Sequence, residues 1–538
     1  MGEKYQKLSF FTISLGFFMA LLDMTIVNIS IPEMTQFFGA SVEDISWVIN
    51  GYNLAFAVFL ITASRIADQF GRKRLFMIGI FLFTLTSLLC GLAKGSVELL
   101  ILFRVLQGIS AAMVVPVTVP LVVQLFPVEK HGAILGVWGA IAGLASASGP
   151  ALGGLLTNAF SWQAVFYVNI PLGILCLILT GKLIKESRDT TASKRIDWLG
   201  MLTLTGALFT LVLALIQAGD MGWGSTYIIT LLAASVVCFI AFFVVEAKVK
   251  EPMLPLSLLR IIPFNAANIT LLIAGVGMVN AFFLLSFFLI EVSGMTVLEA
   301  GLTISAMPIA TIFSSMMAGP LSSKMGTRPF AVLGMICLAV AGYLYSGLNA
   351  DSTKLDIIWR LVIAGLGVGF IIGPVMGAVV RHVPRDKVGV VSGVSNMARS
   401  LGMVLGTALL VTILNPLIMG GLERAIPEMS AKIEANTVLD STVKEKLVNL
   451  VQGTAETGAN QPPQLDAVLQ QVGTVDDAQQ EEIRSLWPQI TKSFREEAST
   501  AFGSTFKYYS FFILIGIIAA YFSDRKPAKK EVVSGAMA

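Results

Sequence analysis

Fourteen apolar runs of membrane-spanning length take up most of this 538-residue sequence. A helix needs about 20 apolar residues to cross the hydrocarbon core, and polar backbone groups in lipid must be satisfied within helices or closed barrels. Only 13 % of the residues are charged, whereas about a quarter are charged in soluble proteins. The sequence therefore predicts an all-α membrane protein with 14 transmembrane helices. The runs lie at about 9–31, 47–67, 75–93, 99–124, 134–156, 164–184, 199–218, 226–246, 265–290, 300–320, 330–348, 357–380, 395–418 and 503–522.

Basic residues gather in alternate loops between these runs. An even number of spans places both termini on one side, and loops rich in Lys and Arg face the cytoplasm. We therefore expect a multi-pass protein of the plasma membrane with both termini cytoplasmic. Representative residues of the basic loops are Lys7, Arg72, Lys185, Arg328 and Lys529.

The segment 420–502 interrupts this pattern because it is polar and has more acidic than basic residues. Two stretches, 429–452 and 475–500, carry apolar residues at helical spacing, and Gln461-Pro462-Pro463 lies between them. We expect an extracellular amphipathic helical hairpin between helices 13 and 14. A role in gating or partner contact and a tolerated solvated insertion are both open readings.

An internal repeat divides the chain. The segment Ser64–Arg74, between helices 2 and 3, shares its skeleton with Gly319–Arg328, between helices 10 and 11. Arg104 in helix 4 corresponds to Arg360 in helix 12. Both matches are displaced by eight helices, which indicates a parallel repeat with a 6+2+6 arrangement. The expected domains are an N-terminal six-helix bundle at 1–190, two inserted helices at 191–260 and a C-terminal six-helix bundle at 261–538.

Asp23 is an acid inside the first apolar run, roughly 13 Å from its outer end at Pro32. A charge at that depth costs about 2.5–3.5 kcal/mol, so it needs a partner, a proton or a water-filled cavity. At helical spacing Asp23 and Ser30 share one face, and Asn28 lies on the opposite face with Thr25. We expect a central helix that lines a pathway. The alternative is a structural aspartate in a buried hydrogen bond.

Arg104 lies roughly 9 Å inside helix 4, close to the depth of Asp23. A fixed guanidinium favours the ionised form of a nearby carboxyl group, so we expect Arg104 to tune Asp23 or a nearby water. Gly108 and Ala112 share its face and permit close helix packing. The alternative is an arginine that snorkels to the interface.

Asp68, Gly71 and Arg72 lie in the loop between helices 2 and 3. A turn with one acid and several bases can dock on the neighbouring half through charge pairs and helix dipoles. We expect these three residues to form a latch that breaks and reforms. A solvated basic loop would explain the bases but neither Asp68 nor the second copy of the loop.

Helix 5 carries Gly149, Pro150, Gly153 and Gly154. Proline and glycine inside a span bend it and permit tight helix contact, so we expect a conformational hinge there.

Helix 9 carries Asn280, Phe283, Phe287 and, at its outer end, Glu291. Aromatic faces together with a carboxylate could hold a flat, hydrophobic cation, so these four residues are candidates for substrate binding. The alternative for Glu291 is an interfacial glutamate in water.

Motifs of enzymes and of metal sites are missing from the sequence. There is no GxSxG, HExxH or Walker loop, and the two histidines, His131 and His382, stand apart. The four cysteines lie singly in apolar runs, which indicates neither disulfides nor a metal centre. We expect no enzymatic activity, no metal and no cofactor other than protons as the coupling ion.

The motifs as a set resemble the fourteen-helix drug:proton antiporter branch of the major facilitator superfamily. The resemblance implies proton-coupled export of hydrophobic, cationic compounds by alternating access, with Asp23 and Arg104 in proton coupling. It adds Asn28 and Gln107 to the substrate-binding candidates and Arg399 to the conformational ones. The matching segments are Leu22–Asn28 with Pro32, Asp68 with Gly71–Lys73, Arg104 with Gln107-Gly108, Gly149-Pro150 with Gly153-Gly154, Phe166 with Asn169, Pro171 and Gly173, and Ser392-Gly393 with Asn396, Arg399 and Gly402.

A second transport function fits the same residues, namely an exporter or flippase of a lipid or cell-wall precursor. In either case the expected partners are small hydrophobic or cationic substrates, protons and membrane lipid. We expect a monomer that binds no nucleic acid.

Overall fold

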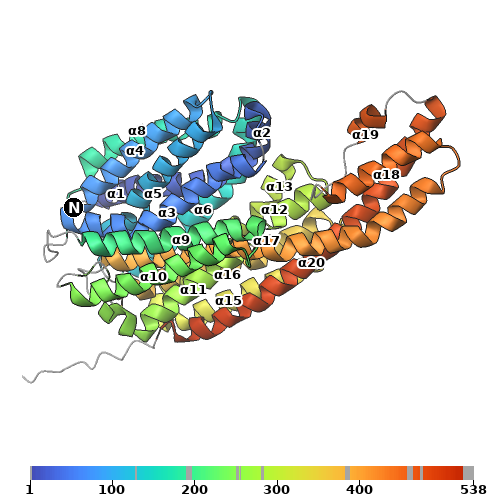
Figure 1. The fold of residues 1–538 in the computed structure, drawn as a ribbon. Helices are drawn as coiled ribbons and strands as arrows, with labels where there is room; N and C mark the ends of the chain where they lie inside the picture. Colours follow the sequence, from blue (N-terminus) through green and yellow to red (C-terminus); the bar gives the residue numbers. More distant parts are fainter. Residues whose placement is uncertain are drawn as a thin grey trace, which may run out of the picture.

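The computed structural model describes residues 3–524 except 41, 128–129, 189–196, 250–251, 253, 255, 280–283, 382–387, 457–464 and 473–475. All regular structure in these residues is helical (Figure 1). Twelve of the helices are long and apolar enough to cross a membrane. The all-helical membrane fold expected from the sequence is thus confirmed in the described part of the chain, and the count of fourteen spans stays a prediction.

The N-terminal helices form one bundle around α1, which packs against α5, α6 and α8. The first predicted span is not one regular helix. The four residues that directly follow α1 form a 3₁₀ turn, η1, and α2 begins after it. The bounds are α1 Glu3–Ile26, η1 Val27–Ser30, α2 Ile31–Phe38, α3 Val42–Phe70, α4 Arg72–Leu92, α5 Val97–Leu125, α6 His131–Ala159, α7 Ala164–Tyr167 and α8 Asn169–Leu183.

The helices α9 (Trp198–Met221) and α10 (Thr226–Lys248) pack on each other. The first of them also contacts α3 of the N-terminal bundle and α17 of the C-terminal bundle. The expected insert therefore lies across the junction of the two bundles (Figure 1).

The C-terminal helices form the second bundle, in which α14 packs on α16 and α11 packs on α17. Contacts between the bundles join α6 to α14 and α16, and join α17 to α3 and α5. The bounds are η3 Leu256–Arg260, α11 Ile262–Val279, α12 Leu285–Phe287, the π-helical turn η5 Phe288–Val292, α13 Val297–Ile304, α14 Ala306–Met325, α15 Arg328–Tyr345, α16 Lys354–Arg381, α17 Val388–Glu434, α18 Ser441–Glu456, α19 Leu465–Val472 and α20 Asp477–Phe522.

The described residues of the segment 420–502 are mostly helical, and the extracellular hairpin stays a prediction. Two helices of the bundle, α17 and α20, run on without a break into it, over 47 and 46 residues (Figure 1). Pro427 and Pro488 lie inside these continuous helices, so the sequence change at 420 does not end a helix. An apolar core that includes Met429, Leu447 and Trp487 holds the extension together.

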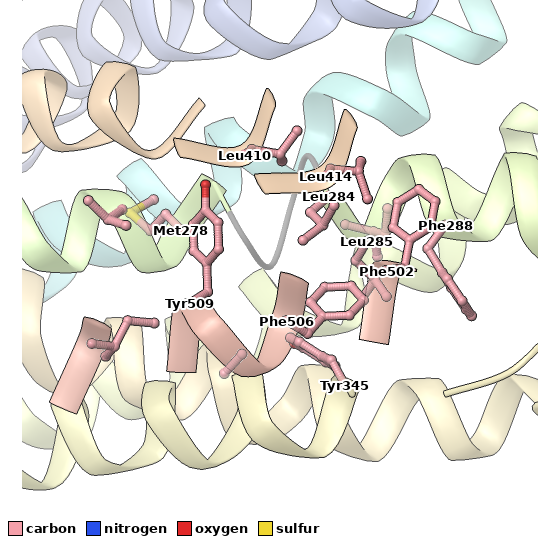
Figure 2. Packing of buried hydrophobic residues seen from close by; sticks show 14 of the residues in the cluster. Met278, Leu284, Leu285, Phe288, Tyr345, Leu410, Leu414, Phe502, Phe506 and Tyr509 are labelled. Atoms are coloured by element: carbon pink, nitrogen blue, oxygen red, sulfur yellow. The ribbon is translucent and has the colours of Figure 1, made fainter. Parts of the chain in front are cut away.

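Aromatic residues fill the core where this extension meets the bundle (Figure 2). Phe288 in η5 makes edge-on contacts with Phe502 and Phe506 in α20, with ring centroids 5.7 and 6.4 Å apart. Tyr509 in α20 reaches α17, where its hydroxyl donates a hydrogen bond to the Gly406 carbonyl. The extension is thus packed continuously onto η5 and the bundle.

Candidate functional site

The centre of the N-terminal bundle holds a buried ion pair between Asp23 of α1 and Arg104 of α5. Arg104 Nη1 donates to Asp23 Oδ2, and the two side chains are 1 % and 0 % exposed. Arg104 Nε also donates to the Val48 carbonyl at 2.9 Å. The sequence predicted that Asp23 and Arg104 interact because they lie at similar depths in the membrane, and the structure brings them together. Asp23 faces the interior of the bundle and not the lipid.

Two amides complete the hydrogen bonds of this carboxylate. Gln107 Nε2 donates to Asp23 Oδ1 at 3.2 Å, and Asn169 Nδ2 of α8 donates to the same oxygen at 2.8 Å. Gln107 Oε1 in turn accepts from Arg104 Nη1 at 2.7 Å. Ser87 of α4 accepts from both amides, at 3.1 and 3.0 Å. Side chains from four helices, α1, α4, α5 and α8, thus form one hydrogen-bonded cluster around the Asp23 carboxylate.

Aromatic rings close the sides of the cluster. The guanidinium carbon of Arg104 lies 4.2 Å from the ring centre of Tyr52 and 5.7 Å from that of Phe166. Tyr52 is itself fixed, because its hydroxyl donates to the Ala20 carbonyl at 3.0 Å. Stacking on the rings stabilises a desolvated guanidinium, so the rings hold the charged group of Arg104 in place.

The hydrogen bonds around Asp23 meet the requirement of a buried ion pair. A buried charge pair is tolerated only with full hydrogen bonding, and breaking one partner away is costly. Arg104, Gln107 and Asn169 supply those hydrogen bonds to the Asp23 carboxylate.

Helix α6 lies directly against α1 beside the cluster, at two of the glycines expected to form a hinge. A Cβ at Gly149 would lie 2.0 Å from Thr25 Oγ1, and one at Gly153 would lie 2.5 Å from the Ile26 carbonyl oxygen. Gly154 is half-buried in the same helix, and the side chain of Pro150 lies outside the described residues. The close contact is confirmed, and a hinge role stays a prediction.

Changing Gly149 to alanine is expected to push α1 away from α6, because the new methyl group has no room against Thr25. We expect a loss of about 1–3 kcal/mol in the free energy of unfolding, measured by denaturation in detergent. Gly181 to alanine in α8 is the matched control, since nothing lies within 4 Å of a Cβ there. An equal effect of the two changes would contradict the packing role of Gly149.

Ser30 does not share the face of Asp23. Its hydroxyl lies 2.8 Å from Thr157 Oγ1 of α6, on the side that Thr25 also faces. The expectation from uniform helical spacing was wrong because the 3₁₀ turn η1 has about 3.0 residues per turn and rotates the face. Asn28 lies in this turn, half-buried and outside the hydrogen-bonded cluster around Asp23.

The expected latch residues lie at the joint between α3 and α4. Asp68 Oδ1 accepts from Arg72 Nε at 2.9 Å, and both side chains are buried. Gly71 has φ +123°, a conformation that side chains rarely adopt. The end of α3 also touches the other bundle, since a Cβ at Gly393 of α17 would lie 2.9 Å from Ser64 Cβ. This contact comes from Ser64, so the docking of Asp68, Gly71 and Arg72 on the neighbouring half stays a prediction.

Glu186, which the sequence analysis missed, caps this joint. Its carboxylate accepts from the backbone N–H groups of Lys73 and Arg74 at 3.0 and 3.2 Å. Gly71 has no side chain for capping, so an acid that follows α8 takes its place. The second bundle repeats the device: Asp524 after α20 accepts from the Thr327 N–H at 2.7 Å, at the start of α15.

Changing Glu186 to alanine is expected to lower the free energy of unfolding by about 0.5–2 kcal/mol, the usual cost of losing a helix N-cap. Denaturation in detergent measures this effect. Glu3 to alanine removes an exposed acid as a control. A Glu186 variant as stable as the control variant would contradict the capping role.

Phe287 and Arg399, the remaining candidates whose side chains the structure describes, lie outside the cluster. Phe287 is exposed at 40 %, and Asn280 and Phe283 lie outside the described residues, as does the side chain of Glu291. Arg399 lies in α17 of the second bundle, where it is 7 % exposed. Among the described residues, no group of His, Cys, Asp and Glu could hold a metal ion.

The sequence signature of the Major Facilitator Superfamily matches residues 13–197 and 193–407 of this chain. The tetracenomycin C resistance and export protein of Streptomyces glaucescens is 34 % identical over 399 residues, 74 % of each chain. The multidrug resistance protein Stp of Mycobacterium tuberculosis is 33 % identical over 445 residues, 82 % of each chain. The multidrug transporter protein MdtP of Bacillus subtilis is 31 % identical over 402 residues, 74 % of each chain.

Solved structures share the fold at low sequence identity. A bacterial homologue of the human lysosomal transporter Spinster aligns with a TM-score of 0.57 at 17 % identity, over 98 % of this chain and 100 % of that one. The human organic anion transporter MFSD10 aligns with a TM-score of 0.56 at 13 % identity, over 77 % and 94 %. The chain therefore belongs to the Major Facilitator Superfamily, a family of transport proteins that are not enzymes.

Proposed function

We propose that this protein exports hydrophobic compounds in exchange for protons, by alternating access across the plasma membrane. The observation that carries the proposal is the Asp23 carboxylate, buried in a transporter fold and held by Arg104, Gln107 and Asn169. An ionisable group inside a membrane is expensive and marks an ion pathway by default. The names of the relatives, which refer to drug resistance and export, support export as the direction of transport.

The proposed topology has fourteen spans, with both termini in the cytoplasm. Twelve helices meet the length and hydropathy required of a span. Adding α6, with 29 residues, and the apolar helix α11, with 18, completes the fourteen. The proposed units remain 1–190, 191–260 and 261–538, and the extension 420–502 would then lie outside the cell.

The proposed cycle uses Asp23 as the proton carrier and the α3–α4 joint as a latch. An inward proton protonates Asp23 and weakens its bond to Arg104, which lets the two bundles tilt. The membrane potential assists by about 2.3 kcal/mol per charge and 100 mV. Asp68 and Arg72 would hold the α3–α4 joint while the contact between Ser64 and Gly393 forms and opens.

The proposed substrates include hydrophobic cations, which Phe287 in α12 and Glu291 in η5 would attract. A substrate panel tests the export proposal as a whole. Purified protein in liposomes with an imposed pH gradient is expected to move ethidium, and movement should stop when nigericin collapses the gradient. Transport that continues unchanged after the collapse would contradict proton coupling.

A further inference from the structure

Arg399 is a buried charge of the C-terminal bundle, and the cluster around Asp23 does not include it. It lies 11 residues into α17 from Val388, about 16 Å along the helix, which is close to the middle of a 30 Å hydrocarbon core. At that depth an arginine is too far from either interface to snorkel. It must therefore find an anionic or strongly accepting partner inside the protein.

The described residues do not supply that partner. The hydrogen bond of the Arg399 guanidinium is a long one, 3.4 Å from Nη2 to Asn396 Oδ1, and its Nε has no acceptor. Within the described ranges no carboxylate forms an ion pair with it. The Asp23 carboxylate, by contrast, forms an ion pair with Arg104, whereas Arg399 forms none with the described residues.

Other unpartnered polar atoms surround the same helix face. The hydroxyls of Ser392 and Ser395 are fully buried and have no hydrogen-bond partner in the described part of the chain. At about 100° per residue they share a face of α17 with Arg399. The hydroxyl of Ser64 on α3 is also buried and has no hydrogen-bond partner among the described residues. It lies next to Gly393 of α17.

Glycine contacts show where this face points. Gly402 packs against α11, since a Cβ there would lie 1.9 Å from the Leu272 carbonyl oxygen, whereas Gly393 packs against α3. Around α17, Arg399 lies about 60° from Gly402 and about 120° from Gly393. A Cβ at Gly275 of α11 would lie 2.3 Å from the Arg399 carbonyl oxygen. The polar face therefore lies beside α11, on a helix that also contacts α3 and α5 of the N-terminal bundle. Transporters with such repeats bind their cargo between the two repeats, near the midplane of the membrane.

We propose that Arg399, with the Ser392 and Ser395 hydroxyls, is a subsite for an anionic group, such as a carboxylate, on the exported compound. The guanidinium would form the charge-assisted hydrogen bond and the serines would donate to the remaining lone pairs. The inference rests on the proposed export function and extends its substrates to hydrophobic acids.

Equilibrium binding to the full-length protein in nanodiscs tests the subsite with three probes on one scaffold. They are 1-naphthylacetate, its methyl ester and (1-naphthylmethyl)trimethylammonium. Arg399→Gln is expected to weaken binding of naphthylacetate by about tenfold or more and to leave the other two unchanged. Arg399→Lys, which keeps the charge, should restore part of the affinity for the acid.

The control is Arg360→Gln, which removes a half-buried arginine of α16 that donates to the Asp356 carbonyl. It should not change the preference between the three probes. An equal loss of all three in Arg399→Gln would show a structural role, and unchanged naphthylacetate binding would show that no such subsite exists. Either result overturns the proposal.

Binding in nanodiscs needs no proton gradient, so this experiment is independent of the coupling mechanism. If the selective loss appears but wild-type protein in liposomes ignores the pH gradient, the subsite stands and proton-coupled export fails. If gradient-driven transport of ethidium occurs without the selective loss, export stands and the subsite fails.

Discussion

Replacing Arg104 by leucine is expected to lower the free energy of unfolding by about 3–5 kcal/mol, because the Asp23 carboxylate then stays buried without its counter-charge. The Gln107 Oε1 atom also loses the hydrogen bond from Arg104 Nη1, so the Gln107 amide that donates to Asp23 is held less firmly in position. Denaturation in detergent, followed by tryptophan fluorescence, measures the loss. It is the largest stability effect we expect from any single exposed or buried arginine in the chain.

A double variant separates charge burial from general damage. Adding Asp23→Leu to Arg104→Leu removes the unpaired carboxylate, so most of the lost stability should return. Arg74→Leu is the control, because that arginine is exposed and its contact with Glu186 is 3.7 Å long. A double variant that is less stable than Arg104→Leu would show that the pair acts through packing instead of charge.

Replacing Asp23 by asparagine is expected to reduce pH-driven transport to the level of protein-free liposomes. Asparagine keeps the shape of the side chain and can still accept hydrogen bonds from Gln107 and Asn169, but it cannot gain and lose a proton. Transport of ethidium under an imposed pH gradient measures the loss.

The variant leaves the buried Arg104 guanidinium without its counter-charge, so a loss of stability is expected as well. Transport is therefore compared at equal amounts of folded protein with unchanged ethidium binding, which separates a defect in coupling from a defect in folding. Glu98→Gln is the matched control, since Glu98 is an exposed acid in the first turn of α5. Its transport rate should equal that of the unmodified protein. Normal pH-driven transport by the Asp23 variant would contradict the proposed proton carrier.

Simple physical rules predicted the helical membrane fold and the main elements of the candidate site. The cost of a charge in lipid singled out Asp23, and equal depths along two helices paired it with Arg104, as the structure shows. Small residues in α5 and α6 indicated close packing, and Gly108, Gly149 and Gly153 each lie against a neighbouring backbone or side chain. The depth of a residue in the membrane and the size of its side chain can both be read from the sequence of a single helix, without knowing how the helices pack.

The partners that come from other helices were not predictable in this way. Ser87 and Asn169 lie in α4 and α8, and their approach to Asp23 depends on how those helices rotate in the bundle. Glu186 is far from Gly71 in sequence, so its cap on α4 gave no local signal. Where a helix changes its winding, as at η1, regular spacing fails, and this misplaced Ser30.

The extension 420–502 shows a further limit of patterning. Its polar composition predicted a boundary near residue 420, yet α17 and α20 continue through it because apolar residues keep helical spacing on one face. The polar composition of a segment indicates that it is exposed to water, but it does not indicate where a helix ends.

Proton release on substrate binding is the most direct test of Asp23 as the coupling group. Purified protein in weakly buffered detergent is mixed with ethidium at a pH where the unliganded protein is protonated, and a pH-indicator dye reports released protons. We expect release from the unmodified protein and none from Asp23→Asn at equal ethidium occupancy. Equal release from both proteins would show that another group carries the proton.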